Sequence, residues 1–281
     1  MILSKPSPEE ETEVAAKVAV VTGASSGIGR QIARFLADAG YTVFGTARRP
    51  ERVSPQPGVN MLALDVLSDD SVATFADQVL SQTGAVDLLV NNAGVTLEGA
   101  VEETSLNELR YLFETNFFGV IRVSKAFLPG MRTRRSGRIV TIGSVAGFLP
   151  KPFEAAYSAS KHALEAWTES LDHEVRQFNV RSILIEPGFI RTSIEQNSGS
   201  AAIHLDAYRE YRNHAASIMR ADIVGGDNPD AVARIVLTAA STPTPKLRYL
   251  AGKGSLWLRL QRTLLPAALF DLGLRKKFRL P

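Results

Sequence analysis

The sequence predicts an α/β fold: a single doubly wound parallel sheet of about seven strands with helices on both faces. Short apolar runs alternate with amphipathic stretches of helical length from Lys17 to Leu250, a rhythm typical of βαβ units with right-handed crossovers. The first run, Lys17–Thr22, is continuously apolar at its centre, as expected for a strand buried on both faces of a parallel sheet. With 45% apolar residues, the 281-residue chain can form a core of this size.

The predicted elements follow one another in a regular order. The strand at 17–22 leads through a glycine-rich turn into a helix at 30–39, which Gly40 ends. Apolar runs of strand length and amphipathic runs of helical length then alternate along the chain. They predict strands at 41–46, 61–64, 86–90, 138–142, 180–185 and 247–250, and helices at 69–82, 106–132, 155–178 and 230–240.

Three segments depart from this rhythm. Residues 1–16 are acidic and short of apolar side chains, which predicts a mobile arm. The alternation stops at about 190–226, where we expect a helical lid inserted into the body, residues 17–250. Residues 251–281 form an apolar and basic C-terminal extension, and Pro266 divides its amphipathic pattern into two short helices.

The composition excludes several kinds of site. The chain has no Cys, and its four His lack metal-ligand spacing, so we predict no disulfide, no thiolate chemistry and no metal. No run reaches about 18 consecutive apolar residues, so no membrane-spanning helix is predicted. The acidic start is unlike a secretory leader, and we expect a cytoplasmic protein.

The formal charge of +3 is unevenly placed. Residues 251–281 hold seven Lys or Arg and one Asp, a net +6, so the rest of the chain carries −3. The body therefore lacks the basic stripe of a nucleic-acid-binding protein, and no such partner is expected. The extension could pack over a pocket or a partner subunit, lie on an anionic membrane surface through 256–280, or only frame the fold.

The turn after the first strand is rich in glycine. Thr22–Gly29 holds glycines at 23, 27 and 29, which let the backbone turn tightly and approach a diphosphate at the start of the next helix. We therefore predict a dinucleotide-binding turn. A tight turn without a ligand is the alternative.

The end of the second strand indicates which dinucleotide is bound. An NAD site usually places a carboxylate there, whereas this chain has Arg48 and Arg49. Arg48 could form a charge-assisted fork with a 2′-phosphate, and the Ser26 hydroxyl could add a hydrogen bond. The pattern favours NADP(H) over NAD(H), although both arginines could simply be solvated.

Tyr157 and Lys161 lie four residues apart on a predicted helix and therefore share a face. A neighbouring ammonium stabilises a phenolate, so we expect Lys161 to lower the pKa of Tyr157. A phenol tuned in this way can serve as a general acid or base. Alone, the spacing also fits a chance pair on a solvated helix.

The glycine turn and the Tyr–Lys pair together resemble the short-chain dehydrogenase/reductase family. The resemblance covers about Lys17 to Leu250 and implies a Rossmann-like, nucleotide-binding catalytic domain. Its motifs are Thr22–Gly29, Asp65-Val66, Asn91–Gly94, Asn116, Ser144, Tyr157–Lys161 and Pro187-Gly188 with Thr192. Finer features resemble the branch of 17β-hydroxysteroid and retinol dehydrogenases; these are Leu64–Val66, Ala126–Pro129, Gly143–Gly147, Lys161–Glu165, Asn228-Pro229 and Pro245–Tyr249.

The resemblance implies a role for each of four catalytic residues. Tyr157 would exchange a proton with the substrate oxygen, and Lys161 would hold the nicotinamide ribose. Ser144 would donate a hydrogen bond to the developing alkoxide. Asn116 would hold a water in a proton relay.

The resemblance also implies two sets of binding residues. The cofactor would be bound by Gly23, Ser25, Ser26, Gly27, Ile28, Gly29, Arg48, Asp65, Val66, Asn92, Ala93, Gly94, Tyr157, Lys161, Pro187, Gly188 and Thr192. Besides Ser144, the substrate would meet Val95, Phe148, Leu149, Phe153, Phe189 and His214.

These expectations describe an oxidoreductase. It would transfer a hydride between NADP(H) and a carbonyl or a secondary or primary alcohol on a steroid-, retinoid- or lipid-like substrate. A 3-oxoacyl-thioester reductase is the alternative among enzymes, and a non-catalytic NADPH-binding sensor or scaffold is the alternative of another class. The family resemblance further implies a homodimer or homotetramer formed through the helices at 106–132 and 155–178.

Overall fold

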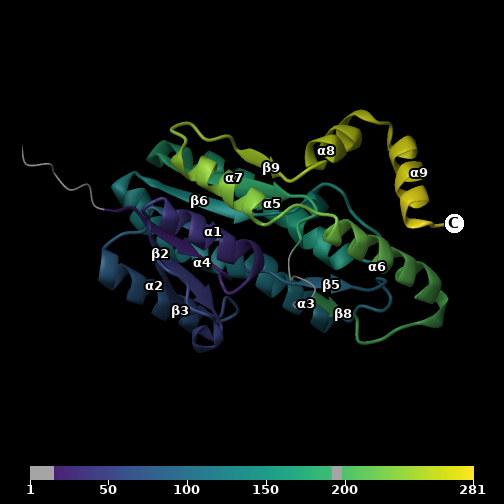
Figure 1. Ribbon diagram of the computed structural model, residues 1–281, viewed down its shortest axis with the longest axis horizontal. Coiled ribbons are helices and arrows are strands. Elements are labelled where there is room, and N and C mark those ends of the chain that lie inside the picture. The colour runs from purple at the N-terminus through teal and green to yellow at the C-terminus, as the bar shows by residue number, and fades with distance from the viewer. Residues whose placement is uncertain (1–15, 192–197) are drawn as a thin grey trace, which may run out of the picture.

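A parallel sheet of seven strands forms the centre of the structure, a computed structural model that describes residues 16–191 and 198–281 (Figure 1). The strand order is β3-β2-β1-β4-β6-β7-β9. The bounds are β1 (Val18–Val21), β2 (Thr42–Ala47), β3 (Val59–Ala63), β4 (Leu88–Asn91), β6 (Gly137–Ile142), β7 (Val180–Pro187) and β9 (Arg248–Ala251). The predicted doubly wound α/β fold is thus confirmed. The acidic arm, apart from Ala16, and Thr192 lie outside the described residues.

Helices cover both faces of this sheet. On one face lie α1 (Gly27–Asp38) and α7 (Asp230–Ser241); on the other lie α2 (Asp69–Thr83), α4 (Gly119–Arg134) and α5 (Ala155–Val175). Successive side chains of a strand point to opposite faces, so Ala19 and Val21 pack in the α1–α7 core while Val18 and Val20 pack in the other. This two-sided burial explains why the first strand is apolar at every position.

The long helix expected at 106–132 is interrupted. It consists of α3 (Leu106–Phe113), a π-helical turn at Glu114–Phe118, and α4. A capping box between Ser105 and Glu108 fixes its start. The π turn carries Asn116 into the protein interior, a local insertion that helical periodicity does not reveal.

The segment predicted to be a helical lid contains a short strand as well as a helix. Strand β8 (Ser198–Ser200) pairs in parallel with β5 (Thr96–Glu98), and α6 (Arg209–Val224) follows. The buried Glu103 holds this segment to the body, because its carboxylate accepts from the Leu205 amide at 2.7 Å and pairs with Arg212. The two strands were not predicted, since three-residue strands offer too little pattern to detect.

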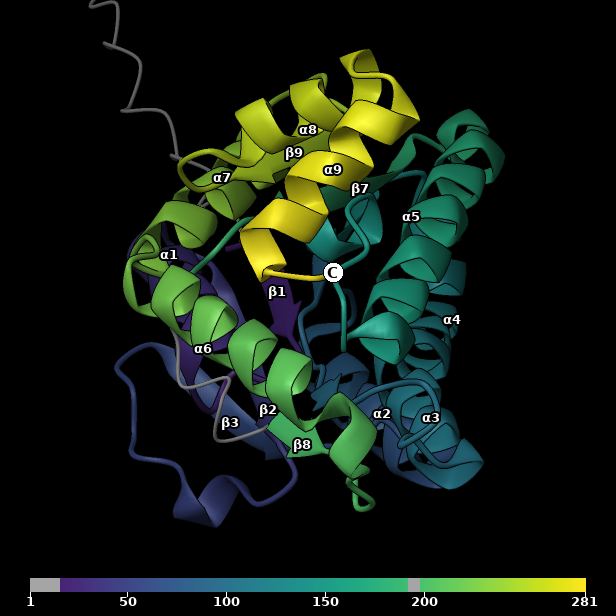
Figure 2. The same cartoon turned by 90° about the vertical axis from the view of Figure 1, so that its right-hand side faces the viewer.

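The C-terminal extension folds back onto the lid. It forms the two predicted helices, α8 (Ser255–Leu264) and α9 (Ala267–Phe278), separated at Pro266. Figure 2 shows α9 descending from α8 towards α6. Phe278 and Leu274 pack there against Met219. Within the described residues, no helix has the length and apolar character needed to cross a bilayer.

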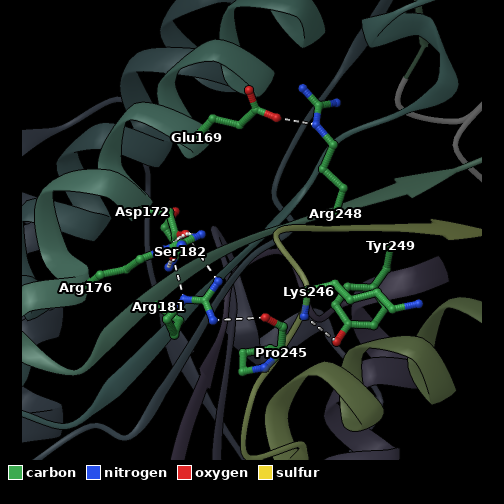
Figure 3. A network of polar contacts seen from close by, with 9 residues as sticks. All are labelled: Glu169, Asp172, Arg176, Arg181, Ser182, Pro245, Lys246, Arg248 and Tyr249. Atoms are coloured by element: carbon green, nitrogen blue, oxygen red, sulfur yellow. Dashed lines mark hydrogen bonds and ion pairs between the residues drawn. The ribbon is translucent and has the colours of Figure 1, made fainter. Parts of the chain in front are cut away.

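A buried carboxylate fastens α5 to the edge of the sheet (Figure 3). Asp172 is fully buried and accepts from Arg181 Nε at 2.8 Å, from the Ser182 amide at 2.9 Å and from Arg176 Nε at 2.6 Å. One turn away, Glu169 pairs with Arg248 of β9. Helix α5 is thereby held against β7 and β9, which fixes the position of its first turns, where Tyr157 and Lys161 lie.

Candidate active site

A cavity of about 290 Å³ opens at the carboxyl edge of the sheet. It is lined by residues that follow β1, β2, β4, β6 and β7, together with the start of α5 and part of α6. The chain winds to opposite sides from β1 and β4, and open α/β sheets bind ligands at such a switch point.

The glycine turn at one end of the cavity has the shape of a phosphate cradle. Gly23 has a φ of +65°, and a Cβ atom there would lie 3.0 Å from the Ala93 Cα. A Cβ on Gly29 would collide with Asn92 Nδ2 and the Gly23 carbonyl. Helix α1 begins at Gly27, and the free N–H groups of its first turn carry partial positive charge. The turn therefore fits the diphosphate of a dinucleotide.

Asn92 joins this turn to the end of β4. Its side-chain amide donates to the Thr22 carbonyl at 2.9 Å and to the Gly23 carbonyl at 3.1 Å. The Thr22 hydroxyl in turn accepts from the amides of Asn92 and Ala93 at 2.9 and 3.0 Å. Asn92 thus lines the cavity and also holds the two strand ends in register.

Charged side chains lie where the adenosine half of a dinucleotide would bind. Arg48 is exposed, lines the cavity and, among the described residues, forms no ion pair. Asp65 accepts from the Leu67 amide at 3.0 Å, which fixes its carboxylate beside Val66 at the same wall. These residues suit the adenosine half of a nicotinamide dinucleotide.

Tyr157, Ser144 and Lys161 meet at the other end of the cavity. Ser144 lies close enough to Tyr157 for its hydroxyl to influence the pKa of the phenol. The Lys161 ammonium donates to the Ile142 carbonyl at 2.9 Å and lies 5.8 Å from the centre of the Tyr157 ring. The sequence therefore correctly predicted that these three side chains converge.

One electrostatic expectation is wrong. Burial raises the pKa of Tyr157 to about 12, the Ser144 hydrogen bond partly opposes this, and the charge of Glu154 adds to it. Lys161 does not lower the pKa of the phenol, because its ammonium is directed at the Ile142 carbonyl. Burial also lowers the pKa of Lys161 itself, to about 8.

Asn116 lies behind the cavity wall. Its side chain is fully buried; Oδ1 accepts from the Val95 amide at 2.8 Å, and Nδ2 donates to the Val95 carbonyl at 2.9 Å and to Ser160 Oγ at 3.2 Å. These bonds occupy the amide in positioning the segment that leads to β5. Its part in a proton relay stays a prediction.

All the predicted cofactor residues that the structure describes line this one cavity. On the substrate side, Val95 and Phe189 do so as well, but Phe148, Leu149, Phe153 and His214 do not.

The four predicted substrate residues outside the cavity lining have other surroundings. Phe148 and Leu149 are buried beneath the C-terminal extension, where the Arg259 guanidinium stacks 4.7 Å from the Phe148 ring. Phe153 has a φ of +62° and packs edge-on against Tyr208 at 6.5 Å. His214 lies on α6 outside the cavity lining, and the buried Nδ1 of this half-buried side chain finds no hydrogen-bond partner among the described residues.

A buried ion pair in the cavity wall, formed by Lys151 and Glu154, was not predicted from the sequence. The Lys151 ammonium lies 2.6 Å from the Glu154 carboxylate, and both side chains are less than one tenth exposed. Lys151 Nζ also lies 3.5 Å from Met219 Sδ and 5.8 Å from the Phe189 ring. Glu154 falls one turn before Tyr157, and a turn in which the Glu154 amide donates to the Lys151 carbonyl at 3.4 Å brings the two side chains together.

Known proteins resemble this chain along most of its length. Residues 17–202 match the family described as short chain dehydrogenase. An uncharacterised oxidoreductase of Bacillus subtilis is 36% identical over 276 residues, which cover 93% of this chain and 98% of that protein. The 3-ketodihydrosphingosine reductase of Bacteroides thetaiotaomicron is 39% identical over 181 residues, 64% of this chain and 66% of that protein. Human retinol dehydrogenase 8 is 36% identical over 256 residues, 83% of this chain and 81% of that protein.

Solved structures agree with these matches. A short-chain dehydrogenase from Streptomyces avermitilis superposes with a TM-score of 0.82 at 36% identity, covering 95% of this chain and 98% of that one. A short chain dehydrogenase/reductase of Burkholderia phymatum in complex with NAD gives a TM-score of 0.74 at 29% identity, covering 88% of this chain and 93% of that one. An alcohol dehydrogenase of Thermococcus sibiricus complexed with 5-hydroxy-NADP gives 0.69 at 28% identity, covering 84% and 96%.

Proposed function

This chain belongs to the short-chain dehydrogenase family, and we propose that it transfers a hydride between NADP(H) and a carbonyl or alcohol carbon on an apolar, lipid-like substrate. One observation carries the proposal: the glycine turn and the Ser144–Tyr157–Lys161 group face a single cavity at the switch point of the sheet. When bound, the nicotinamide supplies the hydride for reduction or accepts it in oxidation.

The side chains of the site handle the proton and the developing charge. During reduction, the Tyr157 hydroxyl gives its proton to the carbonyl oxygen while Ser144 donates a hydrogen bond to the same oxygen. The raised pKa of Tyr157 keeps the phenol protonated at neutral pH, as a general acid requires. The phenolate left behind is stabilised by hydrogen bonding from Ser144, whereas the Lys161 ammonium, which donates to the Ile142 carbonyl, would hold the nicotinamide ribose.

The coenzyme preference depends on Arg48. Relatives of similar structure bind NAD or NADP, so the fold alone does not determine the choice. In this chain arginines rather than a carboxylate stand directly after β2, and the exposed guanidinium of Arg48 is available to a 2′-phosphate beside Ser26. This arrangement supports NADP(H).

The substrate side of the cavity combines apolar and polar surface. Val95, Phe189, Met219 and Ile223 offer an apolar wall, and the Lys151–Glu154 pair adds charge next to Tyr157. The relatives that are named a 3-ketodihydrosphingosine reductase and a retinol dehydrogenase point to long apolar substrates. We therefore favour ketones or alcohols carried on a lipid, retinoid or steroid skeleton.

A substrate panel with the wild-type enzyme and Tyr157→Phe tests this function. Retinal, steroid ketones, long-chain ketones and an acetoacetyl thioester are offered with NADPH, and its absorbance is followed. We expect turnover of at least one apolar ketone, a loss of at least about a hundredfold in Tyr157→Phe, and unchanged NADPH binding. Turnover confined to the thioester favours an acyl-thioester reductase. Tight NADPH binding with no turnover of any substrate indicates a sensor or scaffold.

We also propose that the enzyme assembles as a homodimer or homotetramer through the outer faces of α4 and α5. These long helices lie on one face of the sheet, and partly exposed apolar side chains such as Trp167 lie along them. Sedimentation analysis of the purified protein gives the oligomeric mass, and a monomer at all concentrations would contradict the proposal.

A further inference from the structure

The outward face of the C-terminal helices is unusually apolar. Among the described residues, thirteen large apolar side chains are strongly exposed, and seven of them fall between residues 256 and 272. Their exposed fractions run from 40% to 73%. The seven, here called the outer patch, are Leu256, Trp257, Leu260, Leu264, Leu265, Leu269 and Leu272. Such a concentration marks an interaction surface.

The outer patch is not needed to hold these helices in place. Leu258, Phe270 and Leu274 point inward and pack on the cluster that contains Phe148 and Leu149. Phe278 is buried against Met219 of α6. In the outer patch, Leu256, Leu260 and Leu264 recur every four residues, so they form a stripe on the other side of α8.

Cations lie among the exposed leucines. Arg259 pairs with Glu186 and Lys277 with Asp222, so these two hold the helices to the body. By contrast, Arg275, Lys276 and Arg279 are exposed and form no ion pair within the described part of the chain. The surface therefore combines an apolar stripe with unneutralised positive charge.

We propose that the outer patch docks onto the surface of an anionic phospholipid bilayer. Leu and Trp side chains would enter the boundary between headgroups and acyl chains, and the free cations would meet headgroup phosphates. A second copy of the chain fits this surface less well. In a two-fold dimer the outer patch of one copy would contact the outer patch of the other, so the two segments of net charge +6 would lie close together and repel each other.

The location of the patch connects it to the cavity. Helix α9 packs on α6 (Figure 2). Met219 and Ile223 of α6 line the cavity. An apolar molecule dissolved in the bilayer would therefore be presented near the lid. Docking itself does not depend on the proposed enzymatic function, since it can be measured without substrate.

Flotation of the full chain with lipid vesicles tests the proposal. Phosphatidylcholine vesicles with and without phosphatidylglycerol are compared at low and high salt. We expect binding only to the anionic vesicles and weaker binding at high salt. Leu269→Gln/Leu272→Gln should reduce the bound fraction at least about tenfold, and Arg275→Gln/Lys276→Gln should reduce it on anionic vesicles.

Matched controls make the result specific. Leu106→Gln changes a leucine that is 66% exposed on α3, and it should leave vesicle binding unchanged. Thermal melting verifies that every variant is folded. Equal binding of Leu269→Gln/Leu272→Gln and wild type, or no binding of wild type to anionic vesicles, would overturn the proposal. If the same double variant instead converts a wild-type dimer into monomers, a second copy covers the patch and the bilayer proposal is wrong.

Discussion

Replacing Arg48 by alanine should weaken NADPH binding far more than NADH binding. The two coenzymes differ by the 2′-phosphate, and Arg48 is the exposed cation that lines the cavity just beyond β2. A hydrogen-bonded charge pair contributes about 1.5–3 kcal/mol, and solvent exposure at this site favours the lower end of that range. Since about 1.4 kcal/mol is a tenfold change in affinity, we expect the Kd for NADPH to rise about tenfold and that for NADH to change by less than about twofold.

The neighbouring Arg49 provides a matched control. It is also exposed and carries the same charge, but it does not line the cavity. Arg49→Ala should therefore leave both affinities close to wild type. Titration of protein fluorescence with each coenzyme measures the four values. Equal losses of NADPH and NADH affinity in Arg48→Ala, or an Arg49→Ala variant that behaves like Arg48→Ala, would refute the role assigned to Arg48.

Three further predictions concern charge inside the protein. The pKa of Lys161 is lowered to about 8, so its ammonium loses its proton above that pH, while the pKa of Tyr157, about 12, keeps the phenol protonated. We therefore expect kcat/KM for ketone reduction to fall above pH 8. A flat pH profile up to pH 10 would contradict this. Lys151→Met should lower the free energy of unfolding by about 3–5 kcal/mol, because it leaves Glu154 buried without its partner. Adding Glu154→Gln to this variant should restore part of that loss. Additive losses of the two substitutions in urea denaturation would show that the pair is not coupled. Asp172→Ala should also lower the free energy of unfolding by about 3–5 kcal/mol, because it removes the buried carboxylate that pairs with Arg176 and Arg181. A loss below about 1 kcal/mol in urea denaturation would show that this network does not hold α5.

The sheet and the cofactor half of the site were predictable because their causes are local. A strand buried on both faces must be apolar throughout, as Val18–Val21 is. A turn that approaches a phosphate must carry glycine where a Cβ would collide, as at Gly29. Each of these requirements leaves a readable pattern in a few consecutive residues.

The substrate half depends on tertiary packing and was predicted poorly. Phe148 and Leu149 follow Ser144 closely enough to suggest pocket residues, yet the C-terminal helices cover them more than a hundred residues later in the chain. Lys151 and Glu154 are only three residues apart, but their burial depends on distant residues such as Met219 and Phe189, which lie against Lys151. The pKa of Tyr157 likewise depends on where the Lys161 ammonium points, and the spacing of four residues does not determine that.

The attachment of α9 to α6 has a mechanical consequence. Lys277 and Phe278, within the last five residues, fasten the extension to the helix that supplies Met219 and Ile223 to the cavity. Removing the final turn, or adding an affinity tag that pulls on it, would loosen that helix. Measurements of turnover or substrate range should therefore leave the contacts of Lys277 and Phe278 with α6 intact.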